Sequence, residues 1–271
     1  VSLPDPGVGM GLVGLRSIPV VGLESERDHL WNELRSVIAN GEQRVVFIKG
    51  QTGSGKTRLA RWLTRSAHRR GLAQYAMADL RGEVEQGASL ASALASHIGL
   101  DASMSADEAL LVVASHLSRH RCDGVMARRA YLAAFDSVLS QIERTQSSSD
   151  EERRETFGEL VSQLAQKKPM ILVLDDFVHD ESALGFVEQL LGQANAPYLI
   201  VATYRDELLA SDERHQGLHR VLLEHERCSE LSIAPLSATA CQKFTRSLLG
   251  LSAELTKQVA QTARGLPETA R

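Results

Sequence analysis

The sequence predicts an α/β fold in which helices cover both faces of a central parallel sheet. Two long apolar runs, in "MILVLDD" (170–176) and "YLIVATYRDE" (198–207), are typical of strands buried on both faces. They alternate along the chain with helical patterns, as in proteins built on a parallel sheet. A glycine-rich loop between an earlier strand and a helix is the third observation. The 271 residues, 43% of them hydrophobic, suffice for one large domain or for a domain and part of another.

The predicted elements follow one another as this fold requires. An amphipathic helix is predicted over 25–39, because apolar residues recur there at helical spacing. The other predicted elements are a strand over 44–48, the helix after the glycine-rich loop, a strand over 73–79, a mainly helical stretch over 87–168, a strand over 170–176, a helix that includes 188–193, strands over 198–207 and 229–237, and helices near 237–248 and 252–264.

A phosphate-binding loop follows the first predicted strand. Residues 50–57, "GQTGSGKT", fit the P-loop pattern G-x-x-x-x-G-K-[ST]. The glycines let backbone N–H groups point inward and form an anion-binding nest, at which the next helix aims its positive end. Lys56 would reach the β- and γ-phosphates of a nucleotide, and Thr57 would ligate Mg²⁺. We therefore predict ATP or ADP with Mg²⁺ as ligand, held by Gly50, Gln51, Thr52, Gly53, Ser54, Gly55, Lys56, Thr57 and Arg58.

Two acids end the strand predicted over 170–176. Ligands of parallel sheets lie beyond the carboxyl ends of the strands, so Asp175 would arrive beside Thr57 and hold Mg²⁺. Asp176 is placed to orient or deprotonate the water that attacks the γ-phosphate. The alternative is that the acid pair only caps the helix that begins near 180–182.

Three further sequence segments, taken together with the P-loop and the acid pair, form a recognisable family pattern. They are "VVGLESERDHLWNEL" (20–34), "VATYRDE" (201–207) and "ARGLPE" (263–268). In this order and spacing the chain, over about residues 18–268, resembles the STAND class of P-loop ATPases within the wider AAA+ group. It is most similar to bacterial ATPase modules that follow a serine/threonine kinase domain or that sit in large ATP-binding transcription activators.

This resemblance implies roles for four more residues. Val21 and Gly22 would line the adenine pocket through backbone contacts. Arg205 would be the sensor that reaches the γ-phosphate from the end of a strand. Pro267 would pack from a helical lid onto the adenine. Residues 265–267 could instead be an ordinary helix stop, in which proline follows glycine.

Two positions depart from the family pattern. Leu23 stands where the family usually has an arginine after "VG", so that one contact to the nucleotide would be missing. The histidine that often comes two residues after the acid pair comes one position later, at His179, and receives no role here. Gly22 could also be a simple turn before a helix that is capped by Ser25 or Glu24.

The sensor role of Arg205 also has an alternative interpretation. It could pair on the surface with its acidic neighbours, Asp206 or Glu207. Its place at the end of a strand favours the sensor interpretation.

The composition of the chain indicates which classes of partner and which compartment to expect. The net charge of −4 gives no electrostatic case for nucleic acid or membrane. Three widely spaced cysteines indicate reduced thiols and a cytoplasmic protein. We find no apolar run of membrane-spanning length and no signal peptide.

Because the chain begins at Val1 rather than Met and stops at Arg271 just after "GLP", we expect a piece of a longer protein. The set His116, His120 and Cys122 has metal-like spacing but lacks a fourth ligand, so a solvated helix face is favoured.

These observations predict three regions. Residues 1–19 form a linker, 20–235 a P-loop nucleotide-binding domain with a mainly helical insert at 87–168, and 236–271 the start of a helical lid. The predicted function is an ATP- or ADP-binding regulatory switch, with slow ATP hydrolysis, inside a larger signalling or transcription-regulating protein. Lys56, Asp176 and Arg205 would act on the phosphates and the attacking water. Its partners would be nucleotide and other domains of the same polypeptide. The alternatives are an oligomeric AAA+ type motor and a P-loop small-molecule kinase.

Overall fold

The computed structural model describes residues 20–80, 97–100, 104–120, 158, 161–177, 181–193, 195–209, 213–249, 253–263 and 265–267. The predicted linker at 1–19 and much of the predicted insert at 87–168 lie outside these residues. The elements in chain order are α2 (Glu24–Asn40), β1 (Arg44–Gly50), α3 (Lys56–Arg69), β2 (Gln74–Asp79), α5 (Ala106–His120), β3 (Met170–Asp175), α8 (Glu181–Gly192), β4 (Tyr198–Arg205), α9 (Asp206–Leu209), α10 (Glu213–Leu223), β5 (Cys228–Ser232), α11 (Ala238–Leu249) and α12 (Ala253–Ala263).

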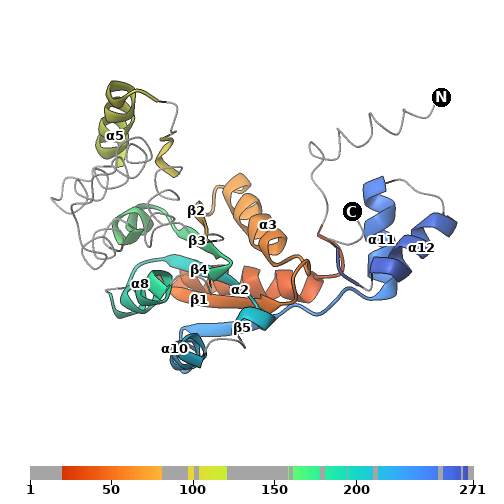
Figure 1. Cartoon of the computed structure of the whole chain (residues 1–271). Coiled ribbons are helices and arrows are strands. Elements are labelled where there is room, and N and C mark those ends of the chain that lie inside the picture. Colours follow the sequence, from red (N-terminus) through yellow and green to blue (C-terminus); the bar gives the residue numbers. More distant parts are fainter. Residues whose placement is uncertain are drawn as a thin grey trace, which may run out of the picture.

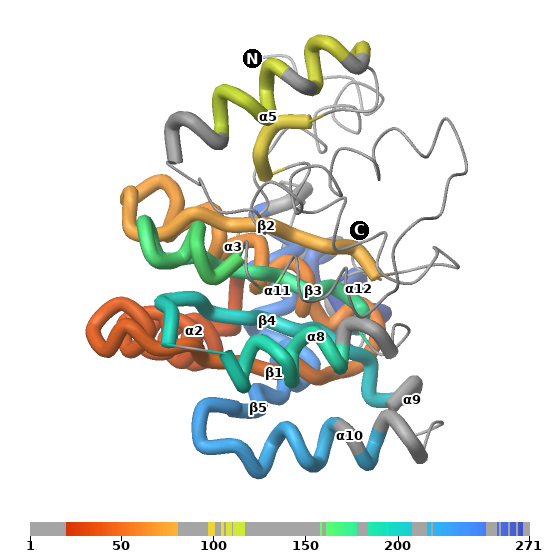
Figure 2. Tube along the Cα trace, turned by 90° about the vertical axis from the view of Figure 1, so that its left-hand side faces the viewer, coloured from red at the N-terminus to blue at the C-terminus, as the bar shows by residue number. Residues whose placement is uncertain are grey.

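The described strands form one parallel sheet in the order β2-β3-β4-β1-β5 (Figure 2). β1 therefore lies between β4 and β5, although neither neighbour follows it directly in the chain. The ends of β1 and β4 are in register, since Gly50 pairs with Arg205. Asp175 ends β3, the next strand along. Three segments that are far apart in the sequence thus leave the sheet at the same edge.

Each face of the sheet carries its own hydrophobic core, because successive residues of a strand point to opposite sides. Val46 and Ile48 of β1 pack on one face with residues of α2 and α3. Val45 and Phe47 pack on the other face with residues of α8 and α10. The predicted α/β fold with a parallel sheet between helices is confirmed.

Several element boundaries differ from the prediction. The strand predicted over 198–207 ends at Arg205, where the short helix α9 begins. The strand predicted over 229–237 is limited to Cys228–Ser232. The helix α10 was not predicted, since its sequence, "ERHQGLHRVLL", is polar over most of its length. It is placed by a few residues, among them the buried Leu222, that pack on the core.

The last two helices, α11 and α12, lie together at one end of the molecule (Figure 1). Cys241 and Phe244 of α11 and Ala263 of α12 join the same core as α2 and α3. Within the described part of the chain, no helix combines the length and the hydropathy that a membrane span needs.

Candidate functional site

The loop between β1 and α3 takes a shape that needs glycine at defined positions. Gly55, at the N-cap of α3, has a φ of 103°, a conformation that side-chain-bearing residues rarely adopt. A Cβ on Gly50 would lie 2.8 Å from the carbonyl oxygen of Ile233. The Ser54 N–H closes the loop by donating to the Gln51 carbonyl at 3.2 Å. The loop therefore wraps tightly in front of the first turn of α3.

The predicted loop residues differ in exposure. Gln51 and Thr52 are exposed, whereas Gly50, Ser54 and Lys56 are buried. The remaining loop residues, Gly53, Gly55, Thr57 and Arg58, are half-buried. The Ser54 hydroxyl is buried and has no hydrogen-bond partner among the described residues. Such a polar atom is expected where a polar ligand completes the site.

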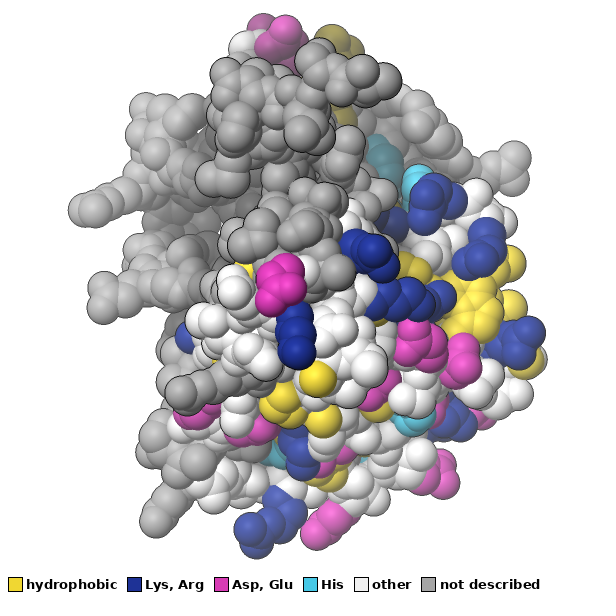
Figure 3. Space-filling model, turned by 90° about the vertical axis from the view of Figure 1, so that its right-hand side faces the viewer, with side chains coloured by type: hydrophobic (Ala, Val, Ile, Leu, Met, Phe, Trp, Pro, Cys, Tyr) yellow, Lys and Arg dark blue, Asp and Glu magenta, His cyan; other side chains and the backbone are white. Residues whose placement is uncertain are grey.

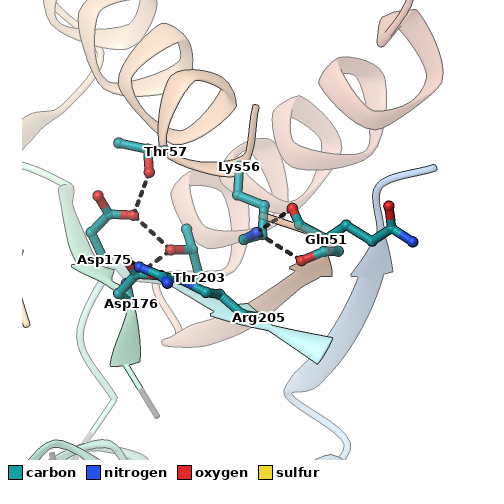
Figure 4. Close-up of polar contacts among 8 residues, drawn as sticks. Gln51, Lys56, Thr57, Asp175, Asp176, Thr203 and Arg205 are labelled. Atoms are coloured by element: carbon teal, nitrogen blue, oxygen red, sulfur yellow. Dashed lines mark hydrogen bonds and ion pairs between the residues drawn. The ribbon is translucent and has the colours of Figure 1, made fainter. Parts of the chain in front are cut away.

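Lys56 folds back into the loop. Its Nζ donates to the carbonyl oxygens of Gly50 at 2.7 Å and Gln51 at 2.9 Å (Figure 4). Burial lowers the pKa of this ammonium group, although the nearby carboxylates, led by Asp176, raise it in part. The cation is thus largely out of water, and its hydrogen-bond partners among the described residues are neutral carbonyls. It is therefore placed to gain from an anion in the loop.

Asp175 lies beside Thr57, as predicted, and its two oxygens differ. Oδ1 accepts from the Oγ1 atoms of Thr57 at 2.8 Å and Thr203 at 2.6 Å. Oδ2 is buried and has no hydrogen-bond partner among the described residues. A fully buried carboxylate with one unsatisfied oxygen, next to a threonine hydroxyl, fits the oxygen ligands that Mg²⁺ prefers.

Asp176 and Arg205 form a two-pronged ion pair. Nε and Nη2 of Arg205 donate to Oδ1 and Oδ2 of Asp176 at 3.1 and 2.9 Å. The backbone of Asp176 has a φ of 57°, which is uncommon outside glycine. Arg205 therefore lies at the candidate site and is not a surface residue engaged only by Asp206 or Glu207.

The predicted adenine-pocket segments meet around Leu236. A Cβ on Gly22 would lie 3.2 Å from the Leu236 side chain and 2.7 Å from Cβ of Ala240. The Leu236 N–H donates to the carbonyl oxygen of Gly265 at 2.8 Å. Val21 and Pro267 are both half-buried. Because Ile233 packs against Gly50, the segment 233–236 connects the phosphate-binding loop to both flanking segments.

The cap that belonged to the alternative interpretation of Gly22 is wrong. The helix α2 begins at Glu24 with Leu23 at its N-cap and no side-chain cap, so neither Ser25 nor Glu24 has that role. Leu23 is instead buried in the core. The Glu24 carboxylate accepts from the N–H of Gly22 at 3.4 Å, which holds the turn that precedes the helix.

Some candidates lie outside the described residues. They include His179, which was considered for a family role, and Cys122 of the rejected metal set.

Sequence reasoning missed Thr203. Its Oγ1 donates to Asp175 and accepts from the N–H of Asp176 at 3.0 Å. The alternation of strand side chains was the available signal, because residues two apart in β4, such as Thr203 and Arg205, lie on one face.

The model of the AAA ATPase domain family matches residues 19–202, roughly two thirds of the chain. The chain belongs to this family. Its membership points to ATP binding. No curated protein is significantly similar to this AAA ATPase domain in sequence.

Solved structures share the fold of this AAA ATPase domain at low identity. Cdc6p from Pyrobaculum aerophilum is 16% identical with a TM-score of 0.58, over 96% of this chain and 62% of its own. The Aeropyrum pernix Orc1 protein in complex with DNA is 17% identical with a TM-score of 0.61, over 96% and 60%. Drosophila ORC bound to DNA is 14% identical with a TM-score of 0.55, over 99% and 60%. The chain thus spans about 60% of the length of these structures.

Proposed function

We propose that this AAA ATPase domain is a nucleotide-operated switch that binds ATP or ADP with Mg²⁺ and hydrolyses ATP slowly. One observation carries the proposal: both cations of the site already have hydrogen-bond partners within the protein. Lys56 is bonded to its own loop, and Arg205 takes both carboxylate oxygens of Asp176. A γ-phosphate can recruit these cations only by breaking contacts that already exist. ATP would therefore change the site more than ADP does.

The residues would divide the chemistry as follows. The loop N–H groups and Lys56 would hold the phosphates, while Thr57 and Asp175 would hold Mg²⁺. When bound, Mg²⁺ would neutralise phosphate charge. Asp176 would orient or deprotonate the attacking water, and Arg205 would contact the γ-phosphate. Asp176 could accept a proton only after Arg205 has left it for the γ-phosphate, so every turnover would include the breaking of this ion pair. Slow hydrolysis is therefore expected.

Sequence features outside the loop support the wider role. "VVGLESERDHLWNEL", "VATYRDE" and "ARGLPE" resemble STAND-class modules of bacterial signalling and transcription-regulating proteins. We accordingly infer a cytoplasmic protein whose partners are nucleotide and other domains of the same polypeptide. Val21, Gly22 and Pro267 would contact the adenine, because the segments that carry them converge on Leu236.

The overall charge supports partners other than nucleic acid. The net charge of −4 gives no general attraction to a phosphate backbone. On the face that Figure 3 shows, Lys and Arg side chains gather in the upper right part, and Asp and Glu side chains below them offset part of this positive charge. Two of the similar structures are bound to DNA, but their likeness to this chain is one of fold.

ATP turnover at several protein concentrations tests this proposal. A switch should bind both nucleotides and release phosphate at about 0.01 s⁻¹ or slower, whatever the protein concentration. A motor that assembles into rings should approach about 1 s⁻¹ or more and speed up as the concentration rises. Fast, concentration-dependent turnover would therefore contradict the switch and favour the motor.

A further inference from the structure

Thr203 contacts both acids of the site, Asp175 and Asp176. Its side chain is completely buried in β4, between β3 and β1. Its hydroxyl makes two hydrogen bonds, donating to Asp175 Oδ1 at 2.6 Å and accepting from the Asp176 N–H at 3.0 Å. One hydroxyl on β4 therefore fixes both the carboxylate of Asp175 and the backbone of Asp176 (Figure 4).

We propose that Thr203 is the positioning residue that presents Oδ2 of Asp175 to Mg²⁺. The inference rests on the proposed binding of ATP with Mg²⁺. Oδ1 already accepts from two hydroxyls, Thr57 and Thr203, whereas the buried Oδ2 accepts from none of the described residues. The two hydroxyls thus fix the carboxylate and leave Oδ2 as the oxygen that a cation could take.

The two hydroxyls that hold Oδ1 have different duties. Thr57 lies in the first turn of α3 and is the predicted Mg²⁺ ligand, so its hydroxyl oxygen would bind the cation while its proton is donated to Asp175. Thr203 lies in the interior of the sheet, and its second bond, from the Asp176 N–H, keeps it in place. Thr203 therefore holds Asp175 from within the sheet, apart from the loop that would bind the nucleotide.

Side chains of β4 contact both acids. Arg205 lies two residues after Thr203, on the same face of β4, and pairs with Asp176. The end of β4 thus contacts the end of β3 through two side chains, one on each acid. Replacing Thr203 should loosen Asp175 and remove the acceptor of the Asp176 N–H, without touching any predicted phosphate contact.

The test is a Mg²⁺ titration in the presence of a non-hydrolysable ATP analogue, with a fluorescent nucleotide as probe, and a parallel titration in EDTA. Thr203→Val keeps the shape and removes the hydroxyl. It should require about 10–100-fold more Mg²⁺ for half-saturation, the usual effect of losing a partner of a metal ligand. Affinity for the analogue in EDTA should change much less, because Thr203 makes no predicted contact with the phosphates. Thr203→Ser keeps the hydroxyl and should restore the parent's Mg²⁺ dependence.

Thr64→Val is the matched control, because Thr64 is also buried but donates to the Arg61 carbonyl in its own helix. It should leave the Mg²⁺ dependence unchanged. Thr203→Ala removes the same hydroxyl. If Thr203→Val does not fold, the Mg²⁺ concentration at half-saturation is measured with Thr203→Ala instead. A Thr203 variant that weakens binding equally with Mg²⁺ and with EDTA, or not at all, would overturn the inference. Failure of the parent itself to bind nucleotide would instead overturn the proposed function.

Discussion

At the scale of single residues, Lys56 should decide nucleotide affinity. Its ammonium is buried, and burial lowers its pKa. Within the described part of the chain, its hydrogen bonds go to neutral carbonyls, so an incoming phosphate would supply the charged partner. Lys56→Ala should weaken nucleotide binding by about 10–100-fold, the range expected for charge-assisted hydrogen bonds. Isothermal titration calorimetry with ADP measures this loss.

Lys49→Ala provides the matched control for Lys56. Lys49 carries the same charge one residue before the loop, but it pairs with Glu230 of β5. Its replacement should leave the affinity for ADP within about two-fold of the parent value, since its charge is already paired and partly in water. Equal losses for both variants would mean that general positive charge, and not the loop lysine, holds the phosphates.

Arg205 should separate ATP from ADP. The residue lies at the end of β4, and its planar fork suits a terminal phosphate. Arg205→Ala should cost about 1–3 kcal/mol in binding a non-hydrolysable ATP analogue and clearly less for ADP. Both titrations are run at the same Mg²⁺ concentration. Arg205→Lys keeps the charge but not the fork, so it should recover only part of the loss. Equal losses for the two nucleotides would leave Arg205 with a purely structural role beside Asp176.

At the scale of elements, the packing of α10 should depend on pH. His219 of α10 is buried between the rings of Phe47 and Tyr204, at centroid distances of 4.8 and 4.9 Å. Burial lowers the pKa of His219 below 6.5, although Glu230 raises it in part. The unfolded chain therefore binds more protons at mildly acidic pH. Stability should be full above pH 6.5 and fall as the pH drops toward the folded-state pKa.

His219→Phe keeps an aromatic ring in this place but cannot titrate. The free energy of unfolding, measured with urea between pH 7 and 5, should fall more steeply in the parent than in the variant. The difference should be at most about 1.4 kcal/mol per pH unit. His225→Gln, which changes an exposed histidine, should retain the parent's slope. Parallel slopes for the parent and His219→Phe would show that His219 has no part in the pH dependence.

The strands of the sheet were predictable from sequence, whereas α10 and the contacts between strands were not. "MILVLDD" and "YLIVATYRDE" are apolar enough to be buried on both faces whatever surrounds them. The segment "ERHQGLHRVLL" has no such run. Its position depends on Leu222 and His219, which pack on the face of the sheet that carries Phe47 of β1. Thr203 and Arg205 reach the acids of β3 only because β4 lies beside β3, which no local pattern states.

At the scale of the whole molecule, segments from both ends of the described chain meet around Leu236. Gly22 and Gly265 come so close to Leu236 and its neighbours that side chains there would clash. The motifs predicted a nucleotide site and named these segments through a family resemblance. Their convergence arises from long-range packing of α11 and α12 on the core and could not be read from spacing. The segment 233–236 links this meeting point to Gly50 of the loop.

Hydrogen exchange by mass spectrometry, with saturating ADP or a saturating non-hydrolysable ATP analogue in Mg²⁺, tests the proposed switch most directly. Both nucleotides should protect the loop at 50–57. Since a γ-phosphate would draw Arg205 away from Asp176, the peptides that contain Arg205 and Leu236 should exchange differently in the two complexes. Identical exchange in those peptides, with the loop protected by both nucleotides, would contradict the switch and leave a domain that binds nucleotide without responding to the γ-phosphate.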